Sequence, residues 1–360
     1  MNAQSPQSSF DLSATCRTPD GHALLAALRH AGEEHGLQMS GDAQALSCDT
    51  GYGRMAAQGA ERGLELHLNA ADEGMLQVMR DMVLHFLQHH AEGLTIDELS
   101  WSDDATRAVG VHPRNFHLLE VAEARRLSRD YIRIRLKGTG LAPLAETGLH
   151  FRLCLPRPGR VPVWPIVGAD ARTVWPEGAD ALHTPAYTII ALDTEAGWLE
   201  FDVYTHGNGP TCHWAEGLVA GTEARRTIGL TGPGGGWLAP TADLIMAGDE
   251  TALPAMVRSL DAAAYGDAPL ILLELADPEA ADCLPARHID RFTLLLRSRG
   301  ESAAAALEEA AAARGPATHI WFAGETSDAQ RLRKLVRSDW AVPRGQHYVA
   351  GYWTRSPADT

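Results

Sequence analysis

The chain has 360 residues, which corresponds to two ordinary domains or three smaller ones. Hydrophobic residues make up 45% and charged residues 21%, a composition that excludes wholesale disorder and fibrous repeats. The formal net charge of -15 argues against binding to nucleic acid or to an anionic membrane, because both require a clustered positive surface. An anionic ligand would therefore need a local group of basic residues.

The N-terminal residues and the cysteines indicate the cellular compartment of the protein. The first nine residues lack the basic and apolar segments of a secretory signal, and no apolar run approaches the roughly 20 residues of a spanning helix. The five cysteines are far apart and odd in number, so they predict neither a disulfide framework nor a cysteine-held metal site. We expect a cytoplasmic protein with a disordered tail over residues 1–9, whose redox chemistry would come from a cofactor.

Residues 10–105 predict a small α+β domain. Residues 10–17 alternate as a strand, and Pro19-Asp20-Gly21 then begins a helix with one apolar face. Two or three short strands follow between residues 44 and 69, separated by glycine-rich turns. A second helix, from residue 72 to about residue 91, carries a clear apolar stripe.

This second helix also carries His85, His89 and His90. Histidines at positions i and i+4 of a helix can share one metal ion. The sequence offers no carboxylate at a matching spacing nearby, and the histidines lie beside the polar face of a packed helix. We therefore interpret them as structural and predict no metal site.

From about residue 114 the pattern changes to short strands. A loop with Gly110 and Pro113 marks the boundary, and residues 131–136, 150–155 and 199–204 alternate between polar and apolar side chains. Such strands with turns between them predict an antiparallel β-barrel over residues 114–239. A flat sandwich would give a similar pattern.

From residue 240 strands and helices alternate. Strands are expected at residues 244–247, 270–275, 292–296, 319–323 and 348–353, with helices between most of them. The apolar runs are continuous, which is typical of strands that are covered on both faces of a parallel sheet. Residues 240–360 therefore predict a doubly wound α/β domain.

Five short segments carry a more specific signal. They are residues 186–189 (AYTI), 205–215 (THGNGPTCHWA), 247–255 (AGDETALPA), 321–325 (WFAGE) and 348–353 (YVAGYW). A barrel followed by a doubly wound domain is the order of the ferredoxin reductase superfamily, and the segments together resemble the siderophore-interacting protein family. Its members are FAD-dependent ferric-siderophore reductases, vibriobactin-utilisation proteins among them. Residues 10–105 resemble a small uncharacterised domain that is often fused in front of such reductases.

The resemblance implies that the barrel binds FAD. An aromatic face with a neighbouring hydroxyl suits the isoalloxazine ring, and two glycines with a proline at a helix start suit a diphosphate. An ordinary strand and a simple helix cap are the alternatives. The residues implied for FAD are Tyr187, Thr188, His206, Gly209, Pro210, Thr211, Cys212 and Trp214.

The sequence departs from the family at two positions. The family's strand reads Arg-x-Tyr-Thr-x-Arg, and its two arginines fall here on Pro185 and Ile190, which cannot pair with phosphate. A charge-assisted hydrogen bond contributes roughly 1.5 to 3 kcal/mol, so this loss weakens the predicted flavin site. The candidates to replace the arginines are His183, Arg157, Arg160 and Arg172.

The resemblance also implies that NADH or NADPH binds to the doubly wound domain, where open sheets bind ligands at the carboxyl ends of their strands. The residues implied are Gly248, Asp249, Glu250, Thr251, Ala252, Leu253, Pro254 and Glu325. Glu325 could instead only stabilise a helix N-terminus. For the anionic ferric siderophore the implied bases are Arg152 and Arg355, each of which could equally be a surface arginine.

The function implied by the resemblance is the reduction of ferric siderophore in the cytoplasm, with electrons passing from NADH or NADPH through FAD. Reduction releases Fe(II), because hard oxygen donors bind Fe(III) better than Fe(II). No catalytic residue beyond the flavin is implied. Two alternatives stay open: a non-catalytic ferric-siderophore binding protein with a weak or lost flavin site, and a general NAD(P)H–flavin reductase.

Overall fold

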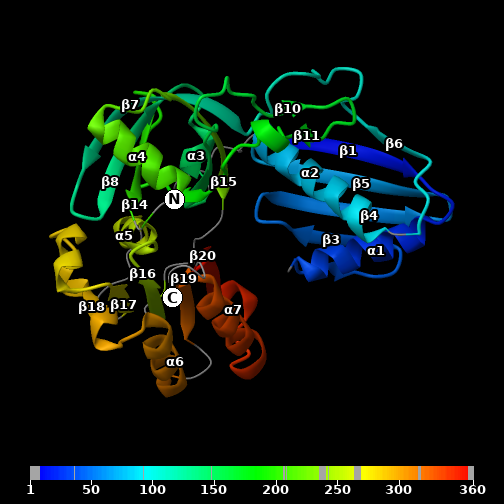
Figure 1. Ribbon diagram of the computed structural model, residues 1–360. Coiled ribbons are helices and arrows are strands. Elements are labelled where there is room, and N and C mark those ends of the chain that lie inside the picture. The colour runs from blue at the N-terminus through cyan, green and yellow to red at the C-terminus, as the bar shows by residue number, and fades with distance from the viewer. Residues whose placement is uncertain are drawn as a thin grey trace, which may run out of the picture. The chain divides into compact units, whose positions relative to one another are not determined.

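The computed structural model describes residues 9–35, 37–91, 93–146, 148–205, 207, 209–234, 241, 243–262, 269–314 and 318–355. The predicted tail at residues 1–9 lies outside this part of the chain except for its last residue. The chain forms two compact units, Met1–His117 with Pro156–Leu182 and Leu118–Leu155 with His183–Thr360 (Figure 1). Within the described residues, no helix is long and apolar enough to cross a membrane.

The first unit contains the predicted α+β domain. Its antiparallel sheet has the strand order β2-β3-β4-β5-β1-β6, and both long helices cover one face of it (Figure 1). Asp20 and Asp72 cap the two helices, because their carboxylates accept hydrogen bonds from Ala23 N and Met75 N, each at 2.9 Å. The elements are β1 (Phe10–Arg17), α1 (Gly21–Glu34), β2 (Ser40–Gly41), β3 (Ala45–Asp49), β4 (Gly53–Ala60), β5 (Gly63–Ala70), α2 (Glu73–His90) and β6 (Glu98–Trp101).

The first unit also includes a segment from the range expected for the barrel. Within Pro156–Leu182 lie β10 (Ile166–Val167), β11 (Thr173–Val174) and the short helix η1 (Gly178–Asp180). Asp81 of α2 accepts hydrogen bonds from the backbone and hydroxyl of Thr173 at 3.0 and 2.6 Å, and Ala171 is fully buried in the core of the unit. The unit boundary therefore cuts through residues 114–239.

The second unit begins with the antiparallel barrel. Its sheet has the order β12-β9-β15-β7-β8-β14-β13, and it curls so that β12 also contacts β14. Alternate strand residues, such as Phe151, Ile134 and Phe201, fill its core. The elements are β7 (Phe116–Arg126), β8 (Tyr131–Lys137), α3 (Pro143–Glu146), β9 (His150–Cys154), β12 (Ala186–Thr188), β13 (Ala191–Asp193), β14 (Trp198–Tyr204), α4 (Pro210–Ala220) and β15 (Thr227–Gly234).

The second unit ends in the predicted doubly wound domain, a parallel sheet of order β18-β17-β16-β19-β20. Leu244 and Met246 of β16 belong to one core cluster and Ile245 and Ala247 to another, which confirms that the strand is covered on both faces. The elements are β16 (Leu244–Asp249), α5 (Leu253–Ala262), β17 (Leu270–Leu275), η2 (Pro278–Cys283), η3 (Ile289–Arg291), β18 (Phe292–Leu296), η4 (Arg297–Arg299), α6 (Ala303–Arg314), β19 (His319–Glu325), α7 (Thr326–Lys334), η5 (Leu335–Asp339), η6 (Arg344–Gln346) and β20 (His347–Trp353).

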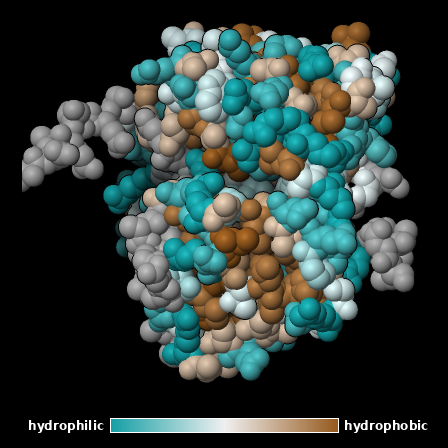
Figure 2. Space-filling model, turned by 90° about the vertical axis from the view of Figure 1, so that its left-hand side faces the viewer, coloured by the Kyte–Doolittle hydropathy of each residue, from teal (hydrophilic) through white to brown (hydrophobic). Residues whose placement is uncertain are grey.

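The strand order positions a ligand site. From β16 the chain adds β17 and β18 on one side of the sheet, and it then adds β19 and β20 on the other side. Ligands of open α/β sheets bind at the carboxyl ends of the strands at such a switch point, which here lies between β16 and β19. Gly248 lets β16 lie close to β19 and to the residue just before α5, since a Cβ at this position would lie 2.5 Å from Ala323 O and 2.6 Å from Ala252 Cβ. Figure 2 shows the side that lies at the left of Figure 1, where hydrophobic residues gather on the lower half, over the doubly wound sheet.

Candidate functional site

A cleft of about 530 Å³ lies in the second unit. Its walls come from β9 and β12 of the barrel, from the N-terminal end of α4, from the start of α5 and from β20. Six of the residues predicted for FAD line it: Tyr187, Thr188, Gly209, Pro210, Thr211 and Cys212. The structure thus brings together two segments of the FAD motif that are separated in the sequence.

The N-terminal end of α4 has the features of an anion site. Gly209 is the N-cap and Pro210 follows it, and no side chain of the described residues caps the helix. The first N–H groups of a helix have no partner within the helix, so they are available to an anion. The Thr211 hydroxyl is buried near the Tyr187 phenol but makes no hydrogen bond of normal length with any described residue. A diphosphate with its acceptor oxygens fits this arrangement.

The aromatic residues of the motif divide between the cleft and the core. Tyr187 lines the cleft and packs against Phe201 and Phe151, with ring centroids 5.1 and 6.3 Å away. Trp214 is fully buried in the barrel core, and its Nε1 donates a hydrogen bond to Arg225 O at 3.2 Å. Trp214 therefore supports the barrel rather than lining the cleft. His206 lies outside the described residues.

The four candidates to replace the family's arginines lie in different places. Arg157, Arg160 and Arg172 belong to the first unit, where Arg160 pairs with Asp180 at 2.7 Å and Arg172 contacts Gln88. His183 lines the cleft, where burial lowers its pKa and favours the neutral ring. Of these four, only His183 is therefore a group of the cleft.

A cation that the sequence reasoning missed approaches the same strand. Arg258 of α5 donates a hydrogen bond to Ile189 O, next to the position where the family has its second arginine. Burial lowers the pKa of Arg258, and its charge also helps to lower the pKa of His150, which lines the cleft. Arg258 and Ile190 both line a neighbouring cavity of about 270 Å³. The sequence gives no local signal for this approach, because α5 is far from β12 along the chain.

Residues predicted for the nicotinamide cofactor surround the carboxyl end of β16. Thr251 and Pro254 line the cleft, whereas Gly248, Ala252 and Leu253 are buried beneath it. Asp249 accepts hydrogen bonds from Thr251 Oγ1 at 2.5 Å and from Trp353 Nε1 at 2.6 Å. Burial raises the pKa of Asp249 to about 6 in spite of these bonds.

The two glutamates of this set already have partners. The Glu250 side chain is 2% exposed, and its carboxylate pairs with Arg297 at 2.6 Å. This ion pair links the end of β16 to the end of β18. Glu325 caps α7, because its Oε2 accepts a hydrogen bond from Ser327 N at 2.7 Å. Burial alone would raise the pKa of Glu325, but the bonds from Ser327 and Arg355 N lower it. The Glu325 carboxylate therefore caps a helix, which was the alternative to a contact with the nicotinamide cofactor.

A hydrogen-bonded chain crosses the cleft. His150 of β9 lies 3.3 Å from the Thr188 hydroxyl through Nδ1 and 2.7 Å from the Tyr352 hydroxyl through Nε2. Tyr352 in turn contacts Tyr348 of β20. Burial, together with the charge of Arg258, lowers the pKa of His150 to about 4. A neutral imidazole thus joins the barrel to the last strand of the doubly wound sheet.

The predicted substrate arginines lie at the rim. Arg152 is exposed, lines the cleft, and donates a hydrogen bond to Thr184 O at 3.3 Å. Arg355 is exposed, and its guanidinium lies 5.8 Å from the ring centroid of Trp353, which lines the cleft. These side chains provide local positive charge on a chain whose net charge is -15.

Two family models match this chain in succession. Residues 120–237 match the siderophore-interacting FAD-binding domain, and residues 241–356 match the siderophore-interacting protein. Together they cover more than half of the chain. The protein is an FAD-binding protein that combines an antiparallel barrel with a parallel α/β domain. More particularly, the chain belongs to the siderophore-interacting protein family.

Individual relatives agree with this assignment. Ferric vibriobactin reductase ViuB of Vibrio cholerae is 28% identical over 260 residues, which span 68% of this chain and 90% of that protein. A siderophore utilization protein from T. fusca is 25% identical, with a TM-score of 0.50 over 70% of this chain and 98% of its own. A siderophore-interacting protein from Acinetobacter baumannii, 20% identical with a TM-score of 0.51 over 68% and 92%, shares the fold.

The His150 interaction predicts a pH dependence of stability. Its pKa falls from 6.5 to about 4 on folding, so the unfolded chain binds the proton more tightly. The free energy of unfolding should therefore decrease by roughly 3 kcal/mol between pH 6.5 and pH 4 through this group. Chemical denaturation of the wild type and of His150→Gln measures this contribution as the difference between the two curves.

The wild type must be compared with His150→Gln because Asp249 changes the free energy of unfolding with pH in the opposite direction. Its raised pKa lets the folded protein bind the proton more tightly, which adds stability as pH falls through about 6. Asp249 is present in both proteins, so its contribution cancels. Parallel curves between pH 6.5 and pH 4 would show that His150 is not a buried neutral group.

The Thr211 hydroxyl predicts an effect on flavin affinity. Thr211→Val keeps the shape of the side chain but removes its hydroxyl, so the dissociation constant for FAD should rise about five- to tenfold. Thr222→Val is the matched control, because Thr222 is exposed just beyond the other end of α4. Fluorescence titration with FAD measures both, and equal affinities for the two variants would remove Thr211 from the flavin site.

Proposed function

We propose that this protein reduces ferric siderophore, with NADH or NADPH as the electron donor and FAD as the carrier. The observation that supports the proposal is the composition of one cleft. Its wall includes the FAD motif at the N-terminal end of α4, two residues of the predicted nicotinamide set and the rim residue Arg152. A carrier must exchange electrons with both donor and acceptor, so one shared space suits the reaction.

The protein contributes binding and electrostatics rather than acid–base chemistry. When bound, FAD supplies the conversion of a two-electron hydride donor into single electrons for Fe(III). The N–H groups at the start of α4 and the Thr211 hydroxyl would hold the diphosphate, and Tyr187 would offer a flat face to the ring. Thr251 and Pro254 line the part of the cleft that the nicotinamide would occupy. The proposed FAD domain is residues 114–239 without residues 156–182, which belong to the first unit, and the proposed nicotinamide domain is residues 240–360.

The substrate class follows from charge and from the relatives. Relatives of this chain carry the names ferric vibriobactin reductase and ferric acinetobactin reductase. An anionic iron chelate approaching an acidic protein needs local cations, and Arg152 and Arg355 are exposed near the cleft. Because the proposed electron donors are cytoplasmic cofactors, we expect the reaction to take place in the cytoplasm.

The alternative of a siderophore-binding protein without flavin draws on Pro185 and Ile190, where the family has arginines. Arg258 argues against this alternative, because it brings a cation from α5 to the carbonyl oxygen of Ile189, next to Ile190. A general flavin reductase differs only in its acceptor. The test must therefore measure turnover and acceptor preference together.

The experiment follows Fe(II) formation from a ferric catecholate chelate under anaerobic conditions. The full chain with added FAD is assayed with NADH and NADPH in parallel, and a ferrous-specific chelator reports the product. The proposal predicts turnover well above that of free FAD with at least one nicotinamide, and a preference for the ferric chelate over unrelated acceptors such as quinones. No turnover with either nicotinamide would overturn the reductase proposal. Equal rates on all acceptors would favour the general flavin reductase.

The rim arginines predict a change in KM. Arg152→Gln and Arg355→Gln should each raise KM for an anionic ferric chelate roughly two- to fivefold, as expected for exposed charges. Higher ionic strength should raise KM for the wild type and affect the double variant less. Arg299→Gln is the matched control, since Arg299 is exposed in the same unit but does not line the cleft. If Arg299→Gln raises KM as much, the effect belongs to the net charge of the protein.

A further inference from the structure

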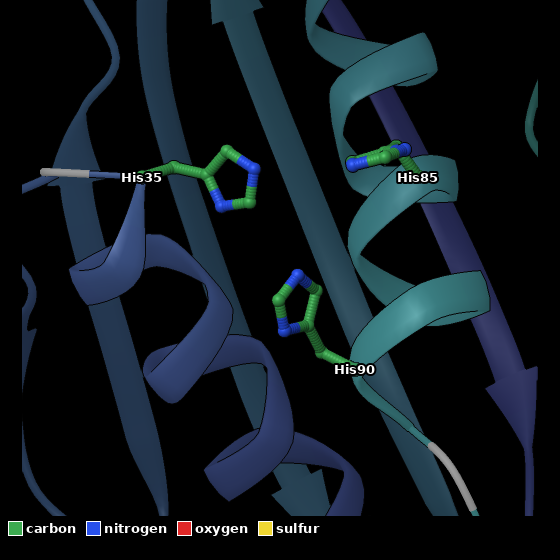
Figure 3. A group of neighbouring side chains, drawn as sticks. All are labelled: His35, His85 and His90. Atoms are coloured by element: carbon green, nitrogen blue, oxygen red, sulfur yellow. The ribbon is translucent and has the colours of Figure 1, made fainter.

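We propose that the first unit binds one divalent transition-metal ion between the ends of α1 and α2, through His35, His85 and His90. This site is separate from the proposed flavin cleft, and nothing in the proposed reductase reaction requires it. One ring nitrogen from each of the three residues lies within 4.8 Å of the other two. Figure 3 shows the three rings turned toward one another, His35 from the end of one helix and the other two from the second helix.

The third histidine is what the sequence interpretation lacked. His85 and His90 both lie on α2, where the sequence predicts a structural role because it offers no carboxylate at a matching spacing nearby and places them beside the polar face of the helix. His35 is the C-cap of α1, which packs beside α2. The ring centroid of His35 lies 5.7 Å from that of His85 and 5.4 Å from that of His90. Tertiary packing therefore assembles three imidazoles from two helices.

Hydrogen bonds prepare two of the rings for a metal. His35 Nδ1 lies 2.9 Å from Ala31 O, and because a carbonyl oxygen only accepts, Nδ1 carries the proton and Nε2 keeps its lone pair. Glu34 Oε2 lies 3.3 Å from His90 Nδ1, so the proton of this ring is also favoured on Nδ1 and the lone pair on Nε2. Metal-binding histidines commonly donate their other N–H to a carbonyl or a carboxylate in this way.

The local charge also suits a cation. His35 and His90 stand at the C-terminal ends of α1 and α2, where unpaired carbonyl groups give each helix a partial negative charge. The Glu34 carboxylate adds a full negative charge beside His90.

The ligand chemistry defines the class of metal. Three neutral imidazoles favour Zn²⁺, Cu²⁺, Ni²⁺ or Co²⁺ over the hard ions Mg²⁺ and Ca²⁺, which prefer oxygen. With metal–nitrogen bonds of roughly 2.1 Å, the ligand nitrogens of a tetrahedral site lie roughly 3.4 Å apart. His35 and His85 are exposed, so rotation of their side chains can close the remaining distance. The fourth position would hold water.

The test uses the full chain without an affinity tag, with Co²⁺ and Zn²⁺ as probes. Equilibrium dialysis should find one tightly bound equivalent of Zn²⁺, and His35→Gln, His85→Gln and His90→Gln should each weaken its binding at least tenfold. His67→Gln is the matched control, because His67 is exposed on β5 between residues that point into the core. It should bind like the wild type.

Two readouts keep the test decisive. Bound Co²⁺ in the wild type should give the intense visible absorption of a four-coordinate site, and this measurement does not depend on any variant folding. The proposal is overturned if the Co²⁺ spectrum is that of the hydrated ion, if the three variants bind Zn²⁺ as tightly as the wild type, or if His67→Gln weakens binding equally. Zn²⁺ should also raise the melting temperature of the wild type more than that of His85→Gln, since a bound ion stabilises only the folded chain.

Discussion

The arrangement of the cleft depends on the hydrogen bonds that join the barrel to the doubly wound sheet within the second unit. His150 meets Tyr352 at 2.7 Å, and the Tyr131 hydroxyl donates to Glu250 O at 2.5 Å. Arg258 adds a third link through Ile189 O. These groups are largely removed from water, so leaving any of them without a partner would cost about 1 to 3 kcal/mol. The links hold the start of α4, the end of β16 and strand β20 around one cleft, and electron transfer requires that proximity.

The supply of positive charge is the second constraint on the proposed flavin site. The family pairs flavin phosphates with two arginines that this chain lacks, and a net charge of -15 makes the deficit more severe. The structure offers other sources of positive potential around the cleft. The N-terminal end of α4 carries the partial positive charge of the helix dipole, and Arg258 of α5 brings a cation to Ile189, the residue after β12. In the proposed flavin site, the phosphates would rely more on backbone dipoles and less on side-chain charge than the family pattern implies.

The parts of the fold that follow local rules could be predicted from the sequence. Alternating strands indicated the barrel, and the buried runs of β16 and β17 indicated a parallel sheet. The motif residues Tyr187 and Thr211 do line one cleft. The features that were missed all depend on contacts between distant segments: the place of residues 156–182 beside Asp81, the approach of Arg258, and the meeting of His35 with α2. Conversely, Trp214 and Glu250 belong to recognised motifs, yet their side chains serve packing and an ion pair, which a motif alone does not reveal.

Retention of FAD tests most directly whether the cleft holds a flavin. The full chain is incubated with excess FAD, desalted, and examined for the absorption bands of bound flavin, with released FAD quantified after denaturation. We expect about one FAD for each chain. We also expect a clear loss of retention for Tyr187→Ala but not for Tyr187→Phe, because the flat ring provides the contact. A colourless wild-type protein that retains no FAD would show that the cleft does not hold a flavin.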